Sequence, residues 1–215
     1  MNSQEKDSHP ARREHWNAAY ASSAPDRVSW YQQTPTLALE LIAGCDLAPD
    51  AAIVDVGGGA STLVDALLAA GYRNVSVLDV AATALSAARE RLGDRASAVT
   101  WLEADITRWR PQSAYDLWHD RAVFHFLTRA ADRAAYTEAL EAALAPGGHA
   151  IIATFAPDGP EQCSGLPVER YSAESLAQEL GPGFALAEVR HETHVTPGGG
   201  AQAFIYCRFV RAEQA

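Results

Sequence analysis

Three carboxylates stand at the ends of short apolar segments and have the chemistry to bind a polar ligand. Asp55 lies in VDVGGGAS just before a run of glycines, Asp79 ends NVSVLD, and Asp105 follows VTWLEA. Carboxylates accept hydrogen bonds, so they suit a ligand with an ammonium group, a sulfonium, a ribose diol and an exocyclic amine, whereas they repel a pyrophosphate. Asp79 is expected to accept both ribose hydroxyls, and Asp105 an adenine amino group. Asp55 is expected to orient the loop or to reach the ammonium group, directly or through water.

The glycine run Gly57 to Gly59 suits a turn in which the backbone approaches a ligand closely. Thr62 stands where a dinucleotide-binding fingerprint has its third glycine, which weakens a nicotinamide cofactor as the interpretation. Lys6 is the only lysine and lies in the polar start of the chain. A P-loop and a pyridoxal phosphate site each need a lysine, so both are excluded. The acids and the turn together describe a site for S-adenosylmethionine.

A second group of ionisable residues interrupts a segment that otherwise reads as a buried strand. A central parallel strand is normally apolar, but YDLWHDR becomes ionisable at His119, Asp120 and Arg121. Breaks of this kind tend to occur at functional sites. The alternative is that Asp120 and Arg121 only pair with structural neighbours. His125 follows closely, and packing in the core is favoured over catalysis for it.

Aromatic residues gather before the core begins, at Trp16, Tyr20, Trp30 and Tyr31. An aromatic face attracts a sulfonium, so these residues could close the site as a lid. The alternative is that they only cover an edge of the sheet, and the sequence leaves both open.

The connection from Ala153 to Ser172 is long and irregular, and such loops are often lids or binding segments. Its reactive or polar residues are Cys163, Arg170 and Tyr171. A packed thiol is favoured over a nucleophile for Cys163, because transfer from a sulfonium needs no covalent enzyme intermediate.

No metal site or disulfide framework is expected. Cys45, Cys163 and Cys207 are odd in number and widely spaced. His191 and His194 lie three apart in a strand-like run, so their side chains should point to opposite faces and could not share one ion.

A parallel sheet would bring these residues together, and the sequence alternates between strand-like and helix-like runs, as in a sheet covered on both faces. Strands are expected at Ala52–Val56, Asn74–Asp79, Val99–Glu103, Tyr115–Asp120 and Ala150–Phe155. Helices are expected around Trp16 and Tyr20 and at Pro35–Ala43, Thr62–Ala70, Ala82–Leu92 and Asp132–Leu144. A further helix at Ala173–Leu180 should start from a Ser172 cap. Two strands, Phe184–Thr193 and Gln202–Arg211, should then pair antiparallel, because their connection is too short for a crossover helix.

Length and composition indicate one large α/β domain of 215 residues. We expect a disordered leader over 1–14, an N-terminal helical lid over 15–45 and the core over 46–215. With 17 basic and 27 acidic residues the formal charge is −10, which argues against nucleic-acid and anionic-membrane partners. No apolar run approaches the roughly 20 residues that span a bilayer, and the start lacks the apolar centre of a signal peptide, so a cytoplasmic location is expected.

Several motifs in series resemble those of class I S-adenosylmethionine-dependent methyltransferases. They are DVGGGAS at Asp55–Ser61, LD at Leu78–Asp79, EADI at Glu103–Ile106, YDLWHDRAVFHFL at Tyr115–Leu127 and LAPGGHAII at Leu144–Ile152. The resemblance covers Ala51 to the end of the sequence. It implies a Rossmann-like three-layer sandwich, with a mostly parallel seven-stranded sheet and an antiparallel C-terminal hairpin.

The same resemblance implies roles for individual residues. Asp120 would lie beside the amino-acid end of the cofactor, and Arg121 would face the pocket of the methyl acceptor. Arg121 and His119 are the catalytic candidates. The implied cofactor-binding residues are Trp16, Tyr20, Trp30, Asp55, Gly57, Gly58, Gly59, Ser61, Asp79, Val80, Asp105, Ile106 and Asp120. The implied substrate-binding residues are Tyr31, Arg121, His125, Cys163, Arg170 and Tyr171.

The leading hypothesis is methyl transfer to a small molecule by a monomer or homodimer. Arg121, with Arg170 as a second cation, favours a thiol or another anionic nucleophile over a protonated amine, because a nearby cation lowers the pKa of a thiol. The alternatives are a protein lysine N-methyltransferase, a nicotinamide-dependent oxidoreductase and a non-catalytic cofactor-binding module.

Overall fold

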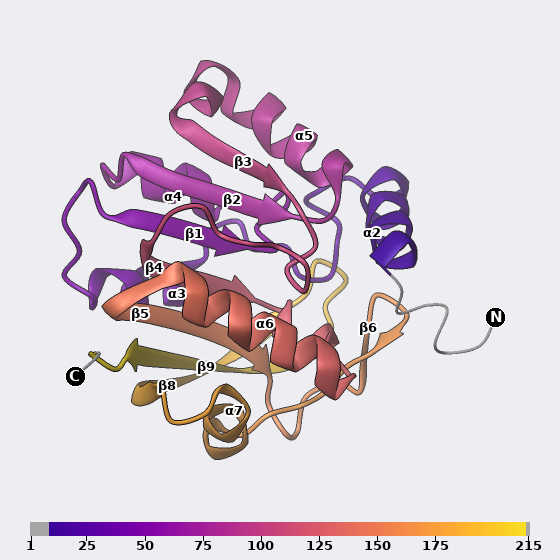
Figure 1. The fold of residues 1–215 in the computed structure, drawn as a ribbon. Helices are drawn as coiled ribbons and strands as arrows, with labels where there is room; N and C mark the ends of the chain where they lie inside the picture. The colour runs from indigo at the N-terminus through magenta and orange to yellow at the C-terminus, as the bar shows by residue number, and fades with distance from the viewer. Residues whose placement is uncertain (1–8, 214–215) are drawn as a thin grey trace.

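The computed structural model describes residues 9–213 and has one seven-stranded sheet at its centre (Figure 1). Its strand order is β3-β2-β1-β4-β5-β9-β8. The parallel strands are β1 (Ala52–Val56), β2 (Asn74–Asp79), β3 (Val99–Glu103), β4 (Tyr115–Arg121) and β5 (Leu144–Phe155). The antiparallel strands at the edge are β8 (Phe184–Val195) and β9 (Ala201–Arg211). A separate small hairpin pairs β6 (Gln162–Cys163) with β7 (Leu166–Pro167).

Helices cover both faces of the sheet, so the fold is the expected three-layer α/β sandwich. One face packs against α6 (Ala130–Ala143), which lies in front of the sheet in Figure 1, and against α7 (Ala173–Leu180), which lies below it near the β8–β9 edge. The other packs against α3 (Thr36–Ala43), α4 (Leu63–Ala69) and α5 (Ala82–Leu92). Neighbouring residues of one strand serve opposite layers: Ile53 packs with the second set of helices and Val54 with the first. The remaining elements are α2 (His9–Ser22) and the 3₁₀ turns η1 (Gly93–Ala98) and η2 (Phe124–Phe126).

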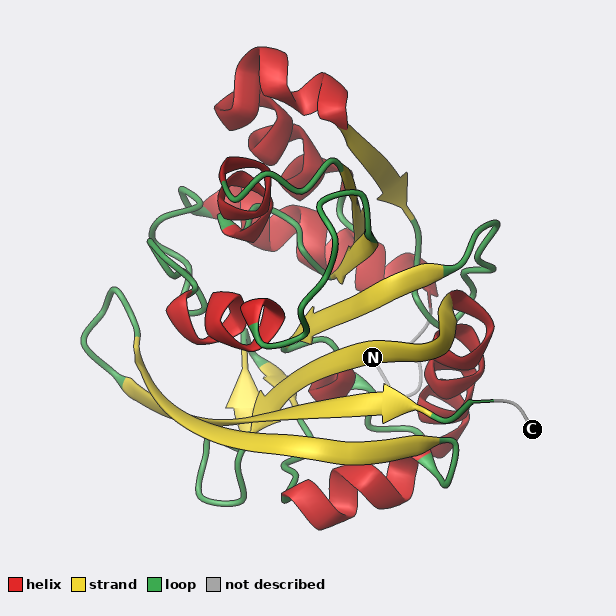
Figure 2. Ribbon diagram, turned by 90° about the vertical axis from the view of Figure 1, so that its left-hand side faces the viewer, coloured by secondary structure: helices red, strands yellow, loops and turns green. Residues whose placement is uncertain are grey.

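The expected strands are present, and three of them have the expected limits. The antiparallel pairing of β8 with β9 is confirmed, and Figure 2 shows this long, curved hairpin ending at the C-terminus. The largest difference is β5, which begins at Leu144 instead of Ala150. The pairing of β4 with β5 shifts register after Tyr115–Leu144, and Gly147, at φ +74°, lies in the segment that bulges out.

Helix starts were partly predictable from caps. Ser172 caps α7 as expected. Its hydroxyl accepts from the backbone N–H of Ser175, and the hydroxyl of Ser175 accepts from the backbone N–H of Ser172.

Among the described residues, no helix has both the length and the apolar character needed to cross a membrane.

The start of α2 corrects the expected disordered leader over 1–14. The helix already begins at His9, while residues 1–8 lie outside the described part of the chain. Contacts that the sequence does not reveal hold its first turns, because Arg12 pairs with Asp105 and Asp132. α2 lies beyond the carboxyl ends of β2 and β3, where it can cover a ligand site (Figure 1).

Candidate active site

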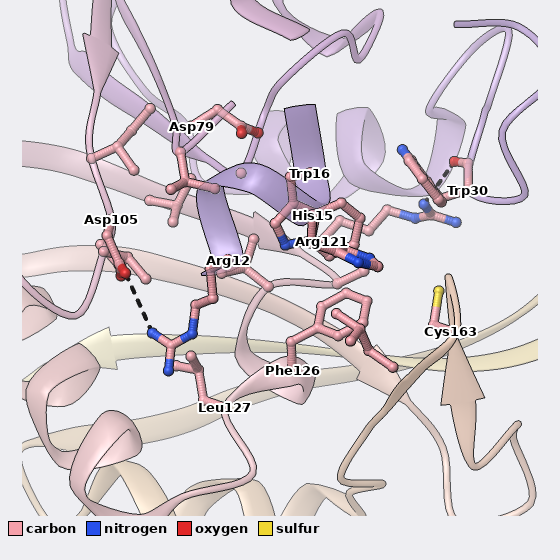
Figure 3. Close-up of a pocket in the computed structure, with 18 of the residues that line it drawn as sticks. Arg12, His15, Trp16, Trp30, Asp79, Asp105, Arg121, Phe126, Leu127 and Cys163 are labelled. Carbon is pink, nitrogen blue, oxygen red and sulfur yellow. Dashed lines mark hydrogen bonds and ion pairs between the residues drawn. The ribbon is translucent and has the colours of Figure 1, made fainter. Parts of the chain in front are cut away.

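A cleft opens at the carboxyl ends of the parallel strands, between α2 and the sheet, and has two parts that meet at Gly57 and Arg121. We call the larger part the main cleft (Figure 3). It is lined by Arg12, His15, Trp16, Tyr20, Trp30, Val56, Gly57, Leu78, Asp79, Val80, Ala104, Asp105, Ile106, Arg121, Ala122, Val123, Phe126, Leu127, Cys163, Leu166 and Pro167. We call the smaller part the glycine-loop pocket, and its lining includes Tyr20, Trp30, Tyr31, Gln32, Asp55, Gly57, Gly58, Ala60, Ser61, His119 and Arg121.

The glycine loop between β1 and α4 requires glycine at two positions. Gly57 and Gly59 have φ values of +66° and +44°, which residues with a side chain rarely adopt. A Cβ at Gly59 would lie 2.8 Å from Asp79 Oδ2, and one at Gly57 would collide with Val123 at 2.0 Å. The backbone N–H of Gly57 donates to the carbonyl of Leu78 at 2.7 Å, which ties the loop to the end of β2. The loop therefore passes the strand ends with its backbone facing the cleft.

Asp79, at the end of β2, is buried in the main cleft. Its Oδ1 accepts from the backbone N–H of Ala81 at 2.8 Å. Burial raises the pKa of Asp79 to about 7, and the charge of Asp55 raises it further, while backbone hydrogen bonds from Ala81, Val80 and Gly59 oppose the shift. A ligand that donates hydrogen bonds to this carboxylate would favour its ionised form.

Asp105, just after β3, is held by its neighbours on the far side of the same cleft. Its Oδ1 accepts from the backbone N–H of Thr107 at 2.9 Å and from the hydroxyl of Thr107 at 2.8 Å. Arg12 Nη1 donates to Asp105 Oδ2 at 3.4 Å. The carboxylate is thus fixed in one orientation at the edge of the cleft.

Asp55 and His119 form a buried pair across β1 and β4, where they are register partners. Their Oδ1 and Nδ1 atoms lie 2.7 Å apart. Asp55 Oδ2 and His119 Nε2 are also buried, and neither has a hydrogen-bond partner among the described residues. Both residues line the glycine-loop pocket. Because buried polar atoms are normally paired, these two indicate a polar ligand group in this pocket, such as an ammonium beside Asp55.

Arg121 joins the two parts of the cleft and is tightly restrained. Its Nε donates to the Tyr206 hydroxyl at 2.8 Å, and its Nη1 donates to the Trp30 carbonyl at 3.0 Å. The guanidinium lies over the Phe204 ring at 4.4 Å, and Nη2 is 3.8 Å from Glu192 Oε2. Nη2 is buried without a hydrogen-bond partner among the described residues, so it can still bind an anionic group of a ligand.

The N-terminal aromatics line the cleft and contact one another edge to face. The ring of Trp16 lies 5.7 Å from that of Trp30 and 4.9 Å from that of Phe126, between centroids. Trp30 Nε1 donates to the Tyr20 hydroxyl at 3.2 Å. Tyr31 borders the glycine-loop pocket. All four aromatics of the sequence analysis therefore line the cleft.

Asp120 is the main correction to the expected site. Because side chains alternate along a strand, His119 and Arg121 face the cleft while Asp120 points to the opposite side of β4. There it is fully buried and accepts from the Tyr136 hydroxyl at 2.7 Å and from the backbone N–H groups of Val123 and Phe124. Burial raises its pKa to about 6. It supports the η2 turn and does not line the cleft.

Three expected substrate-binding residues also lie outside the lining of the cleft. His125 is fully buried between Phe126 and Phe155, accepts from the backbone N–H of Phe155 at 3.3 Å and is kept neutral because burial lowers its pKa to about 3. Tyr171 packs on Phe124 in the core. Arg170 is at the surface and pairs with Glu161 at 3.1 Å. Their places follow from the tertiary path of the η2 turn and of the long loop, which local sequence does not reveal.

Cys163 does line the main cleft, from strand β6. Burial raises the pKa of its thiol to about 11, so the thiol stays protonated at neutral pH. This is the environment of a packed thiol rather than of a nucleophile.

Among the described residues, no group of three or more His, Cys, Asp or Glu side chains is placed to hold a metal ion. His191 is exposed, whereas His194 is buried with its Nε2 2.8 Å from the Ser29 carbonyl oxygen, so the two point to opposite faces as expected.

Sequence reasoning missed three residues that line the main cleft, Arg12, His15 and Phe126, and two that contact Arg121, Glu192 and Tyr206. Arg12 lay in the segment expected to be disordered. Glu192 and Tyr206 belong to edge strands far along the chain, and the pairing of β9 with β5 and of β8 with β9 places them beside Arg121.

The carboxylates of the cleft can accept hydrogen bonds from the donor groups of S-adenosylmethionine, and the comparison with known sequences supports this cofactor. The sequence model of a family described as "Methyltransferase domain" matches residues 54–150, which contain the glycine loop and all three cleft acids. Residues 54–150 belong to this family of methyltransferase domains, as the motifs that resemble class I S-adenosylmethionine-dependent methyltransferases predict. A curated relative from Rhizobium leguminosarum bv. trifolii (strain WSM2304), a trans-aconitate 2-methyltransferase, is 31% identical over 150 residues, which are 69% of this chain. The chain spans 55% of the length of that relative.

Solved structures share the methyltransferase fold over nearly the whole chain. One, from work on the conversion of a disulfide bond into a thioacetal group during echinomycin biosynthesis, is 24% identical with a TM-score of 0.74, over 94% of both chains. Another is the Burkholderia thailandensis 1,6-didemethyltoxoflavin-N1-methyltransferase, solved with its substrate and S-adenosylhomocysteine. It is 18% identical with a TM-score of 0.72, over 96% of this chain and 91% of the other chain.

Proposed function

We propose that this methyltransferase binds S-adenosylmethionine in the cleft and transfers its methyl group to a small molecule. The observation that carries the proposal is the set of acids at three adjacent strand ends around a glycine turn, with a buried Asp55 oxygen that lacks a partner among the described residues. When bound, the cofactor supplies a methyl group on a positively charged sulfur, ready for in-line displacement.

The residues of the chain would divide the binding work between the two parts of the cleft. Asp79 accepts hydrogen bonds from the ribose hydroxyls, and Asp105 from the adenine amine. Asp55 Oδ2 receives the ammonium group in the glycine-loop pocket. His119 holds Asp55 in place through its Nδ1, which makes it a positioning residue in this proposal. Trp16 and Trp30 exclude water from the reacting atoms, so the methyl acceptor competes with little solvent.

The methyl acceptor would bind where the main cleft meets the β6–β7 hairpin. Phe126, Cys163, Leu166 and Pro167 make this wall mostly apolar, and Arg121 adds one cation. The enclosure by aromatics and by the hairpin favours a small acceptor over a protein side chain. A curated relative named for trans-aconitate supports the same class.

Arg121 favours an anionic nucleophile, such as a thiolate or a carboxylate, over a protonated amine. Its Nη2, which has no hydrogen-bond partner among the described residues, is the group that would bind the anion. Glu192, 3.8 Å away, offsets part of this charge, so the preference should be moderate. A monomer or homodimer, a cytoplasmic location and the lack of nucleic-acid partners stay predictions.

The proposal is tested with purified protein and S-adenosylmethionine labelled in its methyl group. A panel of thiols, amines, alcohols, carboxylic acids and metalloid oxyanions is screened for labelled product, with Asp79→Ala as the cofactor-binding control. We expect label in a small molecule with wild-type protein and at least tenfold less with the variant. Label found only in protein lysines would favour a protein lysine methyltransferase, and hydride exchange with NADH would favour an oxidoreductase.

A further inference from the structure

Arg12 of helix α2 reaches across the mouth of the main cleft to two other elements (Figure 3). Its Nη1 donates to Asp105 Oδ2 at 3.4 Å and to the Thr107 hydroxyl at 3.3 Å, both just after β3. Its Nη2 forms a close ion pair with Asp132, in the first turn of α6. One guanidinium thus connects the lid helix, the end of β3 and a helix on the face of the sheet.

These contacts are sheltered from solvent. The side chain of Arg12 is 16% exposed, that of Asp105 3% and that of Asp132 17%. Ion pairs in such places are screened less than surface pairs and hold their geometry better. Arg13, the next residue along the same helix, is exposed and provides a natural comparison.

Helix α2 depends on such polar contacts because it adds little to the core. From Pro10 to Ser22, none of its residues is in the buried core. Its second polar anchor is Asn17, whose Oδ1 accepts from the backbone N–H and the hydroxyl of Thr83 at 3.1 and 2.8 Å. Trp16 packs between these anchors, against Trp30 and Phe126.

The ion pair with Asp105 links the lid to the cofactor site itself. In the proposed function Asp105 recognises the adenine amine, and Thr107 already fixes one of its oxygens. Arg12 fixes the other oxygen from the lid side, in a way that favours the ionised, hydrogen-bond-accepting carboxylate. The same contact therefore holds α2 against the cleft and favours the ionised form of Asp105.

We infer that Arg12 is a positioning residue that clamps α2 over the adenine end of the cofactor, through Asp105 and Asp132, and controls cofactor release. The inference rests on the proposed function, because it assigns the cofactor to the main cleft. Both carboxylates are needed: Asp105 faces the ligand, while Asp132 lies outside the lining of the cleft and holds Arg12, with Arg129 4.0 Å away on its other side. Release of the cofactor then requires these ion pairs to open.

The test measures the rate at which S-adenosylhomocysteine leaves the full-length protein, by stopped-flow tryptophan fluorescence. The variants are Arg12→Ala, Asp132→Asn, their combination and Arg12→Lys, with Arg13→Ala as the matched control. Calorimetry gives the affinities, and urea unfolding checks that the fold is retained. S-adenosylhomocysteine is a zwitterion whose own charged groups also contact the protein, so the difference in salt dependence between wild type and Arg12→Ala reports the ion pairs of Arg12.

We expect Arg12→Ala to release the ligand roughly five- to tenfold faster with little change in the urea midpoint, and Asp132→Asn to do so to a smaller degree. The double variant should be no faster than Arg12→Ala, because both act through one contact. Arg12→Lys should release the ligand at a rate between those of wild type and Arg12→Ala. The lysine keeps the positive charge, but one ammonium cannot reproduce the guanidinium fork that contacts both acids. Raising the salt concentration should speed release from wild type and Arg13→Ala, and much less from Arg12→Ala.

Unchanged or slower release from Arg12→Ala would overturn the inference, as would strictly additive effects of the two substitutions. Tighter binding by Arg12→Ala would mean that Arg12 competes with adenine for Asp105, which is also contrary to it. If wild-type protein does not bind S-adenosylhomocysteine at all, the proposed function fails instead, and the two failures are distinguishable.

Discussion

Asp79 combines a buried carboxyl group with a place in the cleft, so its proton should be coupled to ligand binding. Burial and the nearby Asp55 raise its pKa from 3.8 to about 7. Below pH 4 the group is protonated in both the folded and unfolded states. Between about pH 4 and 7 the unfolded state loses the proton first, so this group lowers stability progressively as the pH rises through that window.

The first prediction follows from this pKa. Ribose hydroxyls donate to an ionised carboxylate, so S-adenosylhomocysteine should bind about tenfold more tightly at pH 8 than at pH 6, with release of a proton. Calorimetry in buffers of different ionisation enthalpy measures both quantities. Asp79→Asn should bind weakly and without this dependence. Equal affinity of the wild-type protein at both pH values would show that Asp79 does not face the ribose.

The second prediction concerns Arg121. With the methyl acceptor found in the labelled screen, Arg121→Ala should lower turnover about tenfold or more, because a charge-assisted hydrogen bond to an anionic nucleophile is lost. Cofactor affinity should change little. For a thiol acceptor, alkaline pH should partly restore turnover, because the thiol is then deprotonated even without a nearby cation to lower its pKa.

The matched control for this change is Arg170→Ala, which removes a surface arginine that pairs with Glu161 and with the Gly159 carbonyl. It should leave turnover unchanged. A large loss of cofactor affinity in Arg121→Ala would instead mean that Arg121 binds the amino-acid end of the cofactor from the glycine-loop pocket.

At the scale of elements, helix α2 contributes to the lining of the cleft but not to the hydrophobic core. It provides Trp16, Tyr20 and Arg12 to the lining, while the hydrophobic clusters on either side of the sheet are built by other elements. A mere cover for the edge of the sheet would contribute buried residues to those clusters.

The third prediction is that a variant beginning at Ser23 keeps most of its resistance to urea but binds S-adenosylhomocysteine at least tenfold more weakly. The reason is that one wall of the cleft is lost while the packed layers stay intact. Calorimetry and urea unfolding measure the two effects separately. If the shortened protein binds S-adenosylhomocysteine with wild-type affinity, α2 only packs on the sheet and has no role in binding the ligand.

The sequence predicts most elements because their signals are local. Apolar runs of five or six residues define β1, β2 and β3 to the residue, and Ser172 marks the start of α7. The three acids were predictable for the same reason, since each lies at or just after the end of such a run. The position of Asp120 in its motif predicts a side chain in the cleft, whereas the alternation of side chains along β4 places it on the opposite face of the sheet.

What the sequence could not reveal depends on distant contacts. The first turns of α2 are held by acids more than ninety residues away, at Asp105 and Asp132. Arg121 is oriented by Tyr206 from β9, and Glu192 from β8 lies beside it. These contacts exist only once the sheet has formed its strand order.

At the scale of the whole molecule, a ligand that joins α2 to the sheet should stabilise the protein. At a concentration one hundred times its Kd, binding contributes about 2.7 kcal/mol, which for a domain of this size raises Tm by roughly 5–10 °C. The fourth prediction is such a rise with S-adenosylhomocysteine and none with ATP, measured by thermal unfolding. A similar rise with ATP would mean that the cleft accepts adenosine without reading the rest of the cofactor.

The central claim is that the acids and the glycine loop select S-adenosylmethionine, and a calorimetric comparison tests it most directly. Wild-type protein and Asp79→Ala are each titrated with S-adenosylmethionine and with NADH. The account predicts micromolar binding of S-adenosylmethionine by the wild type, at least tenfold weaker binding by Asp79→Ala, and no binding of NADH, because its pyrophosphate would meet the carboxylates of the cleft. Tighter binding of NADH than of S-adenosylmethionine would contradict it.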